Sequence, residues 1–152
     1  MIEQIINIWK YFEDCHVKYL VIGGFAVNLY GYTRNTGDLD ILIEDTQVNR
    51  INLRNAFREL GIGDFESIET MEFIPGWTDF TLDFGLRLDI MTSIMGLENF
   101  TFQQLYDEAT IVELGGVQVR FIDYENLIKA KKALNRLKDQ LDIEELGKIN
   151  DE

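Results

Sequence analysis

The chain has 152 residues, 46% of them apolar, and 14 Lys and Arg against 27 Asp and Glu give a formal net charge of −13. This length and apolar content predict a single domain over 1–152 with a substantial core, and they exclude a disordered or low-complexity protein. The acidic balance argues against non-specific binding to duplex DNA, because such binding needs a broad cationic surface.

The sequence shows no signal for export or for a membrane. It has no apolar run of about eighteen residues, the length that a spanning helix needs. Residues 1–14 carry acids where a signal peptide has a basic end. Cys15 is the one cysteine and has no partner for an internal disulfide. We therefore expect a protein of the reducing cytoplasm with no membrane contact.

Hydrophobic periodicity and turn residues define the elements of the first half of the chain. Gly23 and Gly24 end the first strand, and Thr46 is the expected N-cap of the last helix in this half. In chain order we predict a helix over 2–14, a strand over 17–22, a short helix over 25–30, a strand over 38–43 and a helix over 46–60.

The second half contains the hairpin that the sequence indicates most clearly, because Gly115 and Gly116 join two alternating runs. Asp123 can cap a final helix with an apolar stripe, which we expect to break near Asn135. We predict strands over 80–84 and 86–91, a helix over 101–107, strands over 109–114 and 117–122, and a stripe of Leu127, Leu134, Leu137 and Leu141.

Strands and helices mixed in this order predict an α/β (α+β) fold with a mixed central sheet flanked by helices. The aromatic residues, including Trp9, Trp77 and Phe80, are expected in the core.

The residues with the clearest chemical meaning are acids on two of the predicted strands. Asp38 and Asp40 are two apart on one strand, so their side chains share a face. Asp89, on the strand over 86–91, can complete a cluster of three carboxylates if the two strands are neighbours, with Asp83 as an alternative third acid. Oxygen ligands of this kind favour Mg²⁺, and three carboxylates can hold two such ions beside a triphosphate.

The turn at Gly23 and Gly24 lies upstream of these acids. Glycine amides approach phosphate oxygens without obstruction by a Cβ atom. Arg34, just before the acids, can pair with a phosphate or with a surface acid, and both readings stay open.

The pattern of Gly23-Gly24, then Asp38-Leu39-Asp40-Ile41 and a later Asp89 resembles the DNA polymerase β-type nucleotidyltransferase superfamily. Residues 34–40 resemble the Arg-x-Thr-x-Asp-x-Asp segment of its small bacterial members, which include antibiotic nucleotidyltransferases and the AbiEii-like group of abortive-infection toxins. The tail over 127–142 is similar to the closing helix of the AbiEii-like group, with Asn135 where that helix usually has glycine. The resemblance covers roughly residues 17–142.

By this resemblance, the chain is a nucleotidyltransferase that moves a nucleoside monophosphate from an NTP to a hydroxyl and releases pyrophosphate. Asp38, Asp40 and Asp89 would hold two Mg²⁺ ions, with Asp89 also acting as base. The residues implied to hold the NTP are Gly23, Gly24, Arg34, Thr36 and Lys131, with Lys138 as a further candidate.

The sequence does not identify the compound that accepts the nucleoside monophosphate. An RNA end such as that of tRNA, a partner protein and a small molecule are the alternatives. The basic residues of the tail are either a patch for such a ligand or a helix face matched to the acids over 139–145. The alternative function is a non-catalytic nucleotide-binding or partner-binding module of a toxin–antitoxin-like pair.

Overall fold

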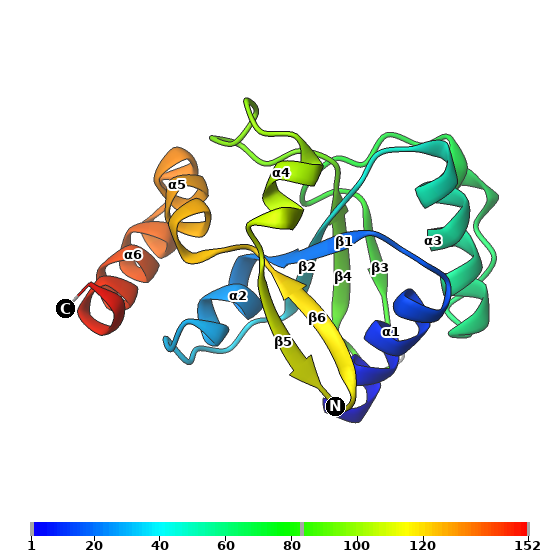
Figure 1. The fold of residues 1–152 in the computed structure, drawn as a ribbon, viewed down its shortest axis with the longest axis horizontal. Coiled ribbons are helices and arrows are strands. Elements are labelled where there is room, and N and C mark those ends of the chain that lie inside the picture. The colour runs from blue at the N-terminus through cyan, green and yellow to red at the C-terminus, as the bar shows by residue number, and fades with distance from the viewer. Residues whose placement is uncertain (1, 83, 152) are drawn as a thin grey trace.

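The computed structural model of the chain describes residues 2–82 and 84–151. Helices and strands alternate through most of its length (Figure 1). In chain order they are α1 (Ile2–Asp14), β1 (Tyr19–Ile22), α2 (Gly23–Leu29), β2 (Asp38–Ile43), α3 (Gln47–Glu59), the 3₁₀ helix η1 (Glu66–Glu69), β3 (Asp79–Thr81), β4 (Arg87–Met91), α4 (Phe102–Asp107), β5 (Thr110–Leu114), β6 (Val117–Phe121), α5 (Tyr124–Leu134) and α6 (Leu137–Asn150).

Within the described residues, six strands form one mixed sheet in the order β3-β4-β2-β1-β6-β5. The pairs β2–β4 and β1–β6 are parallel, and the pairs β1–β2, β3–β4 and β5–β6 are antiparallel. The predicted α/β class with a mixed central sheet is confirmed. β3 is shorter than expected because the chain turns back at Leu82, whose amide donates to the Leu86 carbonyl at 2.8 Å.

The core lies against one face of β2 and β4, as the alternation of these strands predicts. Leu39, Ile41 and Ile43 of β2 are fully buried, and so are Leu88 and Ile90 of β4. The opposite face of the same two strands carries the charged side chains, because successive residues of a strand point to opposite faces.

Helices lie on both sides of the sheet, and four of them are grouped in two pairs. Figure 1 shows α1 and α3 at one end and α5 and α6 at the other, and α1 contacts α3 while α5 contacts α6. Trp9 of α1 is 2% exposed and stacks on Tyr19 with ring centroids 5.1 Å apart. None of the helices in the described part of the chain is long and apolar enough to cross a membrane.

The tail is two helices, α5 and α6, which separate at Asn135 as expected. Asn135 has the left-handed conformation (φ 52°), which asparagine tolerates better than most residues. Of the apolar stripe predicted across this break, Leu127 is buried as expected, but the rest is wrong: Leu134, Leu137 and Leu141 are 41%, 84% and 47% exposed. The break changes the phase of the helix, so α6 turns Asp139 and Asp142 inward instead.

The expectation that the aromatic residues form core holds for Trp9 and Phe80, and it is wrong for Trp77. Phe80 packs on Phe57 with ring centroids 4.8 Å apart. Trp77, by contrast, is 83% exposed, because it occupies a turn before β3 and not a strand or helix face.

Candidate functional site

The parallel pairing of β2 and β4 brings the predicted acids together. In this register Asp40 lies opposite Asp89, and Asp38 lies opposite Arg87. Neighbouring strands are about 4.8 Å apart, so facing side chains are within contact reach. The sequence could not show that strands so far apart in the chain are neighbours. The alternative third acid, Asp83, lies outside the described residues.

Asp38 is engaged by an arginine. Arg87 Nε is 3.1 Å from Asp38 Oδ1, and Arg87 Nη1 is 3.5 Å from Asp79 Oδ2. Among the described residues no three acidic, His or Cys side chains are gathered as a preformed metal site. The three-carboxylate metal site therefore stays a prediction, in which Asp40 and Asp89 face each other and Asp38 has an ion pair with Arg87.

Asp79 is an acid that sequence reasoning missed. It lies on β3 opposite Asp89 in the antiparallel register. The signal available in the sequence was its position directly before Phe80. Its relevance to Asp89 depends on strand pairing, which the sequence does not state.

Asp40 and Asp89 are two partly buried carboxylates whose pKa values are raised by burial and by the repulsion of acidic neighbours. Burial, with the negative charges of Asp89 and Asp38, raises the pKa of Asp40 to about 6, while Lys138 and Lys131 oppose the rise. Burial also raises the pKa of Asp89, against a hydrogen bond of 3.0 Å from the Gly76 amide to its Oδ2. Asp89 Oδ1 is buried and has no hydrogen-bond partner among the described residues. A buried carboxylate oxygen in this situation is a candidate ligand for a cation.

The two glycines at the start of α2 pack closely on this site. Gly23 has φ +65°, and a Cβ atom there would overlap the Asp40 carboxylate. A Cβ atom at Gly24 would lie 2.6 Å from Thr36 Oγ1. Glycine is therefore required at both positions to bring the turn onto Asp40 and Thr36.

We predict that Gly23→Ala destabilises the protein more than Gly116→Ala does. Both glycines have positive φ, but a Cβ atom at Gly116 meets open space. Gly116→Ala should cost about 1–2 kcal/mol for the backbone conformation, and Gly23→Ala about 1–3 kcal/mol more for the displaced carboxylate. Urea unfolding measures both free energies, and equal losses would contradict the close packing of Gly23 on Asp40.

Thr36 and Arg34 lie beside the second glycine. Thr36 Oγ1 donates to the Asp38 carbonyl at 2.9 Å, which fixes the entry to β2. Arg34 binds Asp142 of α6 through two hydrogen bonds, Nε to Oδ1 at 2.9 Å and Nη2 to Oδ2 at 3.0 Å. Arg34 therefore pairs with an acid in this structure, and that acid is buried.

Lys131 is buried, with its Nζ 2.9 Å from Asp142 Oδ2 and 3.3 Å from Asp139 Oδ1. Asp139 also accepts from Arg136 Nε at 2.6 Å. We call these five residues the tail ionic network: Arg34, Lys131, Arg136, Asp139 and Asp142. Part of the basic tail is thus matched to acids of α6. Lys138 is exposed and makes no ion pair within residues 2–82 and 84–151.

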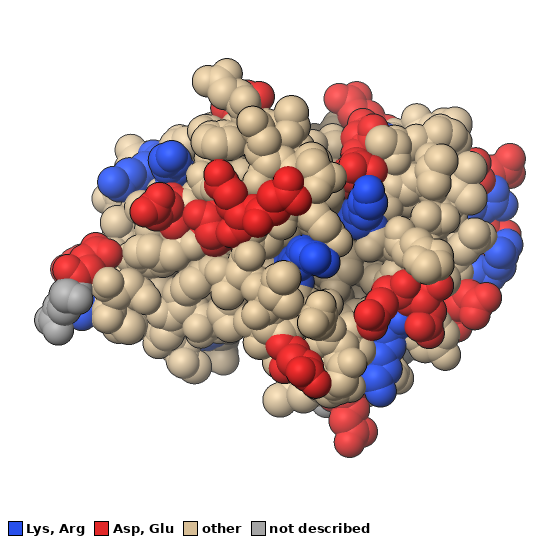
Figure 2. Space-filling model, in the orientation of Figure 1, with Lys and Arg blue, Asp and Glu red and all other residues tan. Residues whose placement is uncertain are grey.

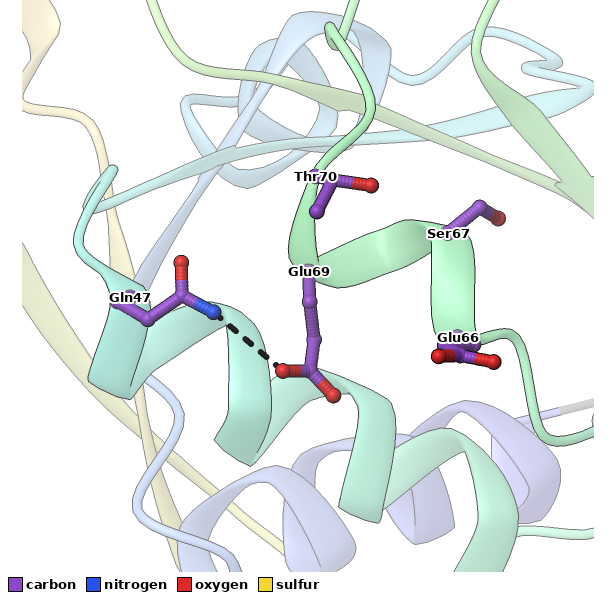
Figure 3. A pocket seen from close by; sticks show the side chains of 5 residues that line it. All are labelled: Gln47, Glu66, Ser67, Glu69 and Thr70. Atoms are coloured by element: carbon purple, nitrogen blue, oxygen red, sulfur yellow. Dashed lines mark hydrogen bonds between the residues drawn. The ribbon is translucent and has the colours of Figure 1, made fainter.

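A surface pocket lies apart from Asp38, Asp40 and Asp89, and none of the three lines it. It has a volume of about 380 Å³ and lies between the start of α3 and η1. Gln47, Glu66, Ser67, Glu69 and Thr70 line it, and Gln47 donates to Glu69 at 3.3 Å (Figure 3). Acidic side chains are spread over the face shown in Figure 2, as the net charge requires.

Comparison with known proteins identifies the fold. The profile of the family described as "Nucleotidyl transferase of unknown function (DUF2204)" matches residues 1–152. A putative nucleotidyltransferase from Thermotoga maritima is similar at 18% identity and a TM-score of 0.61, covering 93% of this chain and 88% of the other. No curated protein matches the sequence significantly.

Two antibiotic-modifying proteins also share the fold. The lincosamide antibiotic adenylyltransferase LnuA, in a lincomycin-bound structure, has a TM-score of 0.63 and 18% identity over 97% of both chains. ANT(2")-Ia in complex with adenylyl-2"-tobramycin has a TM-score of 0.59 and 18% identity, covering 97% of this chain and 87% of the other. At this identity the likeness establishes the fold, which is that of nucleotidyltransferases.

Proposed function

We propose, since the chain belongs to the nucleotidyl transferase family DUF2204, that it moves a nucleoside monophosphate from an NTP to a hydroxyl acceptor in a Mg²⁺-dependent reaction. The acceptor oxygen forms a bond to the α-phosphorus, and the bond from that phosphorus to the departing pyrophosphate oxygen breaks. The hydroxyl proton passes to a carboxylate.

The observation that supports this most directly is the pairing of Asp40 with Asp89. Two carboxylates directly opposite each other repel, and burial together is unfavourable without a cation. Asp89 also has a buried oxygen with no partner among the described residues. An oxygen-only donor set of this kind fits Mg²⁺.

In this proposal Asp38, Asp40 and Asp89 hold the metal, with two ions as the family resemblance implies. The metal, when bound, neutralises the negative charge of the triphosphate and of the departing pyrophosphate. Asp89 also accepts the proton of the acceptor hydroxyl. Arg87, which pairs with Asp38, offsets part of the negative charge of this face.

The nucleotide would lie against the turn at Gly23 and Gly24, with Thr36 beside it. Arg34 and Lys131 are the proposed phosphate contacts from the loop and from α5, and both also pair with Asp142. Lys138 is near enough to Asp40 to affect its pKa. We therefore place the phosphates on the side of the site that faces the tail helices.

We propose the following for the domain, its relatives and its acceptor. Residues 1–152 act as one nucleotidyltransferase-like domain, and the tail over 127–142 relates it to the AbiEii-like group. The acceptor is a hydroxyl compound; two proteins of the same fold have an antibiotic or its adenylylated form in their structures.

The test is nucleotide transfer from α-labelled NTPs with Mg²⁺, read as pyrophosphate release and as labelled product. Asp89→Asn should lower transfer by about a thousandfold or more, because it removes the base and a proposed metal carboxylate, and excess EDTA should abolish it. Asp107→Asn, an exposed change on α4, is the control and should keep wild-type activity. The proposal fails if wild-type protein releases no pyrophosphate from any NTP and Mg²⁺ with NTP gives no thermal shift.

A further inference from the structure

One large apolar side chain lies in water close to the proposed site. The chain has two tryptophans; Trp9 is 2% exposed and Trp77 is 83% exposed. A tryptophan side chain can bury about 150–250 Å². Because Trp77 is exposed, the protein does not gain most of the favourable free energy of burying it. Exposed aromatic rings beside polar groups are typical of ligand contacts.

Trp77 is held by a well-defined turn. Pro75 precedes Gly76, which has φ +80°, and the Trp77 amide donates to the Ile74 carbonyl at 3.0 Å. This is the pattern of a type II turn. Thr78, which is buried, accepts from the Ile74 amide through its Oγ1 at 2.7 Å. The backbone that carries the indole is therefore fixed on both sides.

The same turn is bonded to the proposed base. The Gly76 amide donates to Asp89 Oδ2 at 3.0 Å, and the Ile90 amide donates to the Thr78 carbonyl at 3.2 Å. Consecutive Cα atoms are about 3.8 Å apart. The backbone of Trp77 is therefore one residue from the amide that contacts Asp89, which puts the carboxylate within reach of a ligand that also contacts the exposed indole.

The charges around the site distinguish two sides. The cations near Asp40, Lys131 and Lys138, come from the tail helices. On the side of Trp77, Asp79 lies opposite Asp89. The cation next to them, Arg87, already pairs with Asp79 and Asp38, so acids outnumber cations there. A polyanion such as RNA would be repelled there, whereas a neutral or cationic compound would not.

We propose that Trp77 is one wall of the acceptor subsite and stacks on the ring of a neutral or cationic hydroxyl compound. This inference rests on the proposed function, which places the acceptor hydroxyl at Asp89. Stacking on a tryptophan face suits both flat rings and cations. The nucleobase of the NTP and an RNA end are the competing occupants that the experiment separates.

The first experiment uses the tryptophan fluorescence of the full chain with Mg²⁺. Iodide quenching reports on Trp77, because Trp9 is buried. Tyrosinamide, a cationic hydroxyl compound with a ring, should protect Trp77 from iodide; serinamide, its ring-free counterpart, should not. Protection by α,β-methylene-ATP alone or by an eight-residue oligoadenylate would overturn the proposal, as would no protection by tyrosinamide.

The second experiment measures tyrosinamide affinity by calorimetry in the presence of Mg²⁺ and α,β-methylene-ATP. Trp77→Ala should weaken binding about tenfold, and Trp77→Phe should restore most of it. Ile111→Ala, an exposed change on β5, is the control. Unchanged affinity in Trp77→Ala, with the nucleotide-dependent thermal shift intact, overturns this inference alone. If the wild type itself shows no nucleotide-dependent thermal shift and releases no pyrophosphate, the proposed function is overturned.

Discussion

Asp40→Asn is expected to abolish nucleotide transfer and at the same time to stabilise the free protein at pH 8. Transfer should fall by about a thousandfold or more, equivalent to roughly 4 kcal/mol, because the variant loses a proposed metal carboxylate. The gain in stability has a different cause, which is the repulsion that Asp40 experiences from Asp89 and Asp38.

The pH dependence follows from the raised pKa of Asp40. Burial and its acidic neighbours raise this pKa from 3.8 to about 6 in the folded protein. Folding therefore favours the protonated carboxyl, and the wild type loses stability as the pH rises from about 4 to about 6. The full destabilisation by the charged Asp40 is present above pH 6. We expect it to be about 1–3 kcal/mol, since Asp40 is only partly buried and solvent screens part of the repulsion. Asparagine carries no charge and avoids it.

Urea unfolding of both proteins at pH 4 and pH 8 measures this effect. The variant should be more stable at pH 8 and nearly equal to the wild type at pH 4. Added Mg²⁺ should raise the melting temperature of the wild type and leave that of Asp40→Asn unchanged. Glu113→Gln, which removes an exposed acid of β5, should behave as wild type in all three measurements. A variant that is equally stable at pH 8 and still active would refute both parts.

Lys131→Met is expected to cause the largest loss of stability. The Lys131 side chain is 6% exposed and lies between the carboxylates of Asp139 and Asp142, which are 0% and 1% exposed. Removing the cation leaves two buried carboxylates close together, with Arg136 and Arg34 as their remaining ion-pair partners among the described residues. Breaking a buried ion pair from one side costs about 3–5 kcal/mol.

Urea unfolding and amide hydrogen exchange measure this loss, and exchange should increase first in α6. Lys132→Met, an exposed neighbour on the same helix, is the matched control and should change stability by less than about 0.5 kcal/mol. The double variant Lys131→Met/Asp142→Asn should recover part of the loss, because it removes one of the two charges. A single variant as stable as its control would show that Lys131 contributes nothing to folding.

Local chemistry determined many of the elements. Gly115 and Gly116 join β5 and β6 as predicted, and Thr46 caps α3 by accepting from the Asn49 amide. The alternation of residues 38–43 separated the buried face of β2 from its acidic face. Each of these features depends on residues a few positions apart, so the sequence contains all the information they need.

The two tail helices show both what local sequence predicts and what it does not. The break at Asn135 could be anticipated, because it needs one residue in a left-handed conformation. The faces of the helix beyond the break could not, because they depend on how the chain restarts after it. The expected apolar stripe was therefore wrong past Leu127, and Asp139 and Asp142 are buried in its place.

From the sequence alone came the family resemblance, the mixed α/β class, the acids and the glycine turn. The tertiary structure alone decided that Asp40 lies opposite Asp89 and that Arg87 forms an ion pair with Asp38. It also decided that Lys131 is buried and that Trp77 is exposed. The physical reason is distance along the chain. Strand neighbours and burial arise from contacts between residues tens of positions apart, and local propensity carries no record of them.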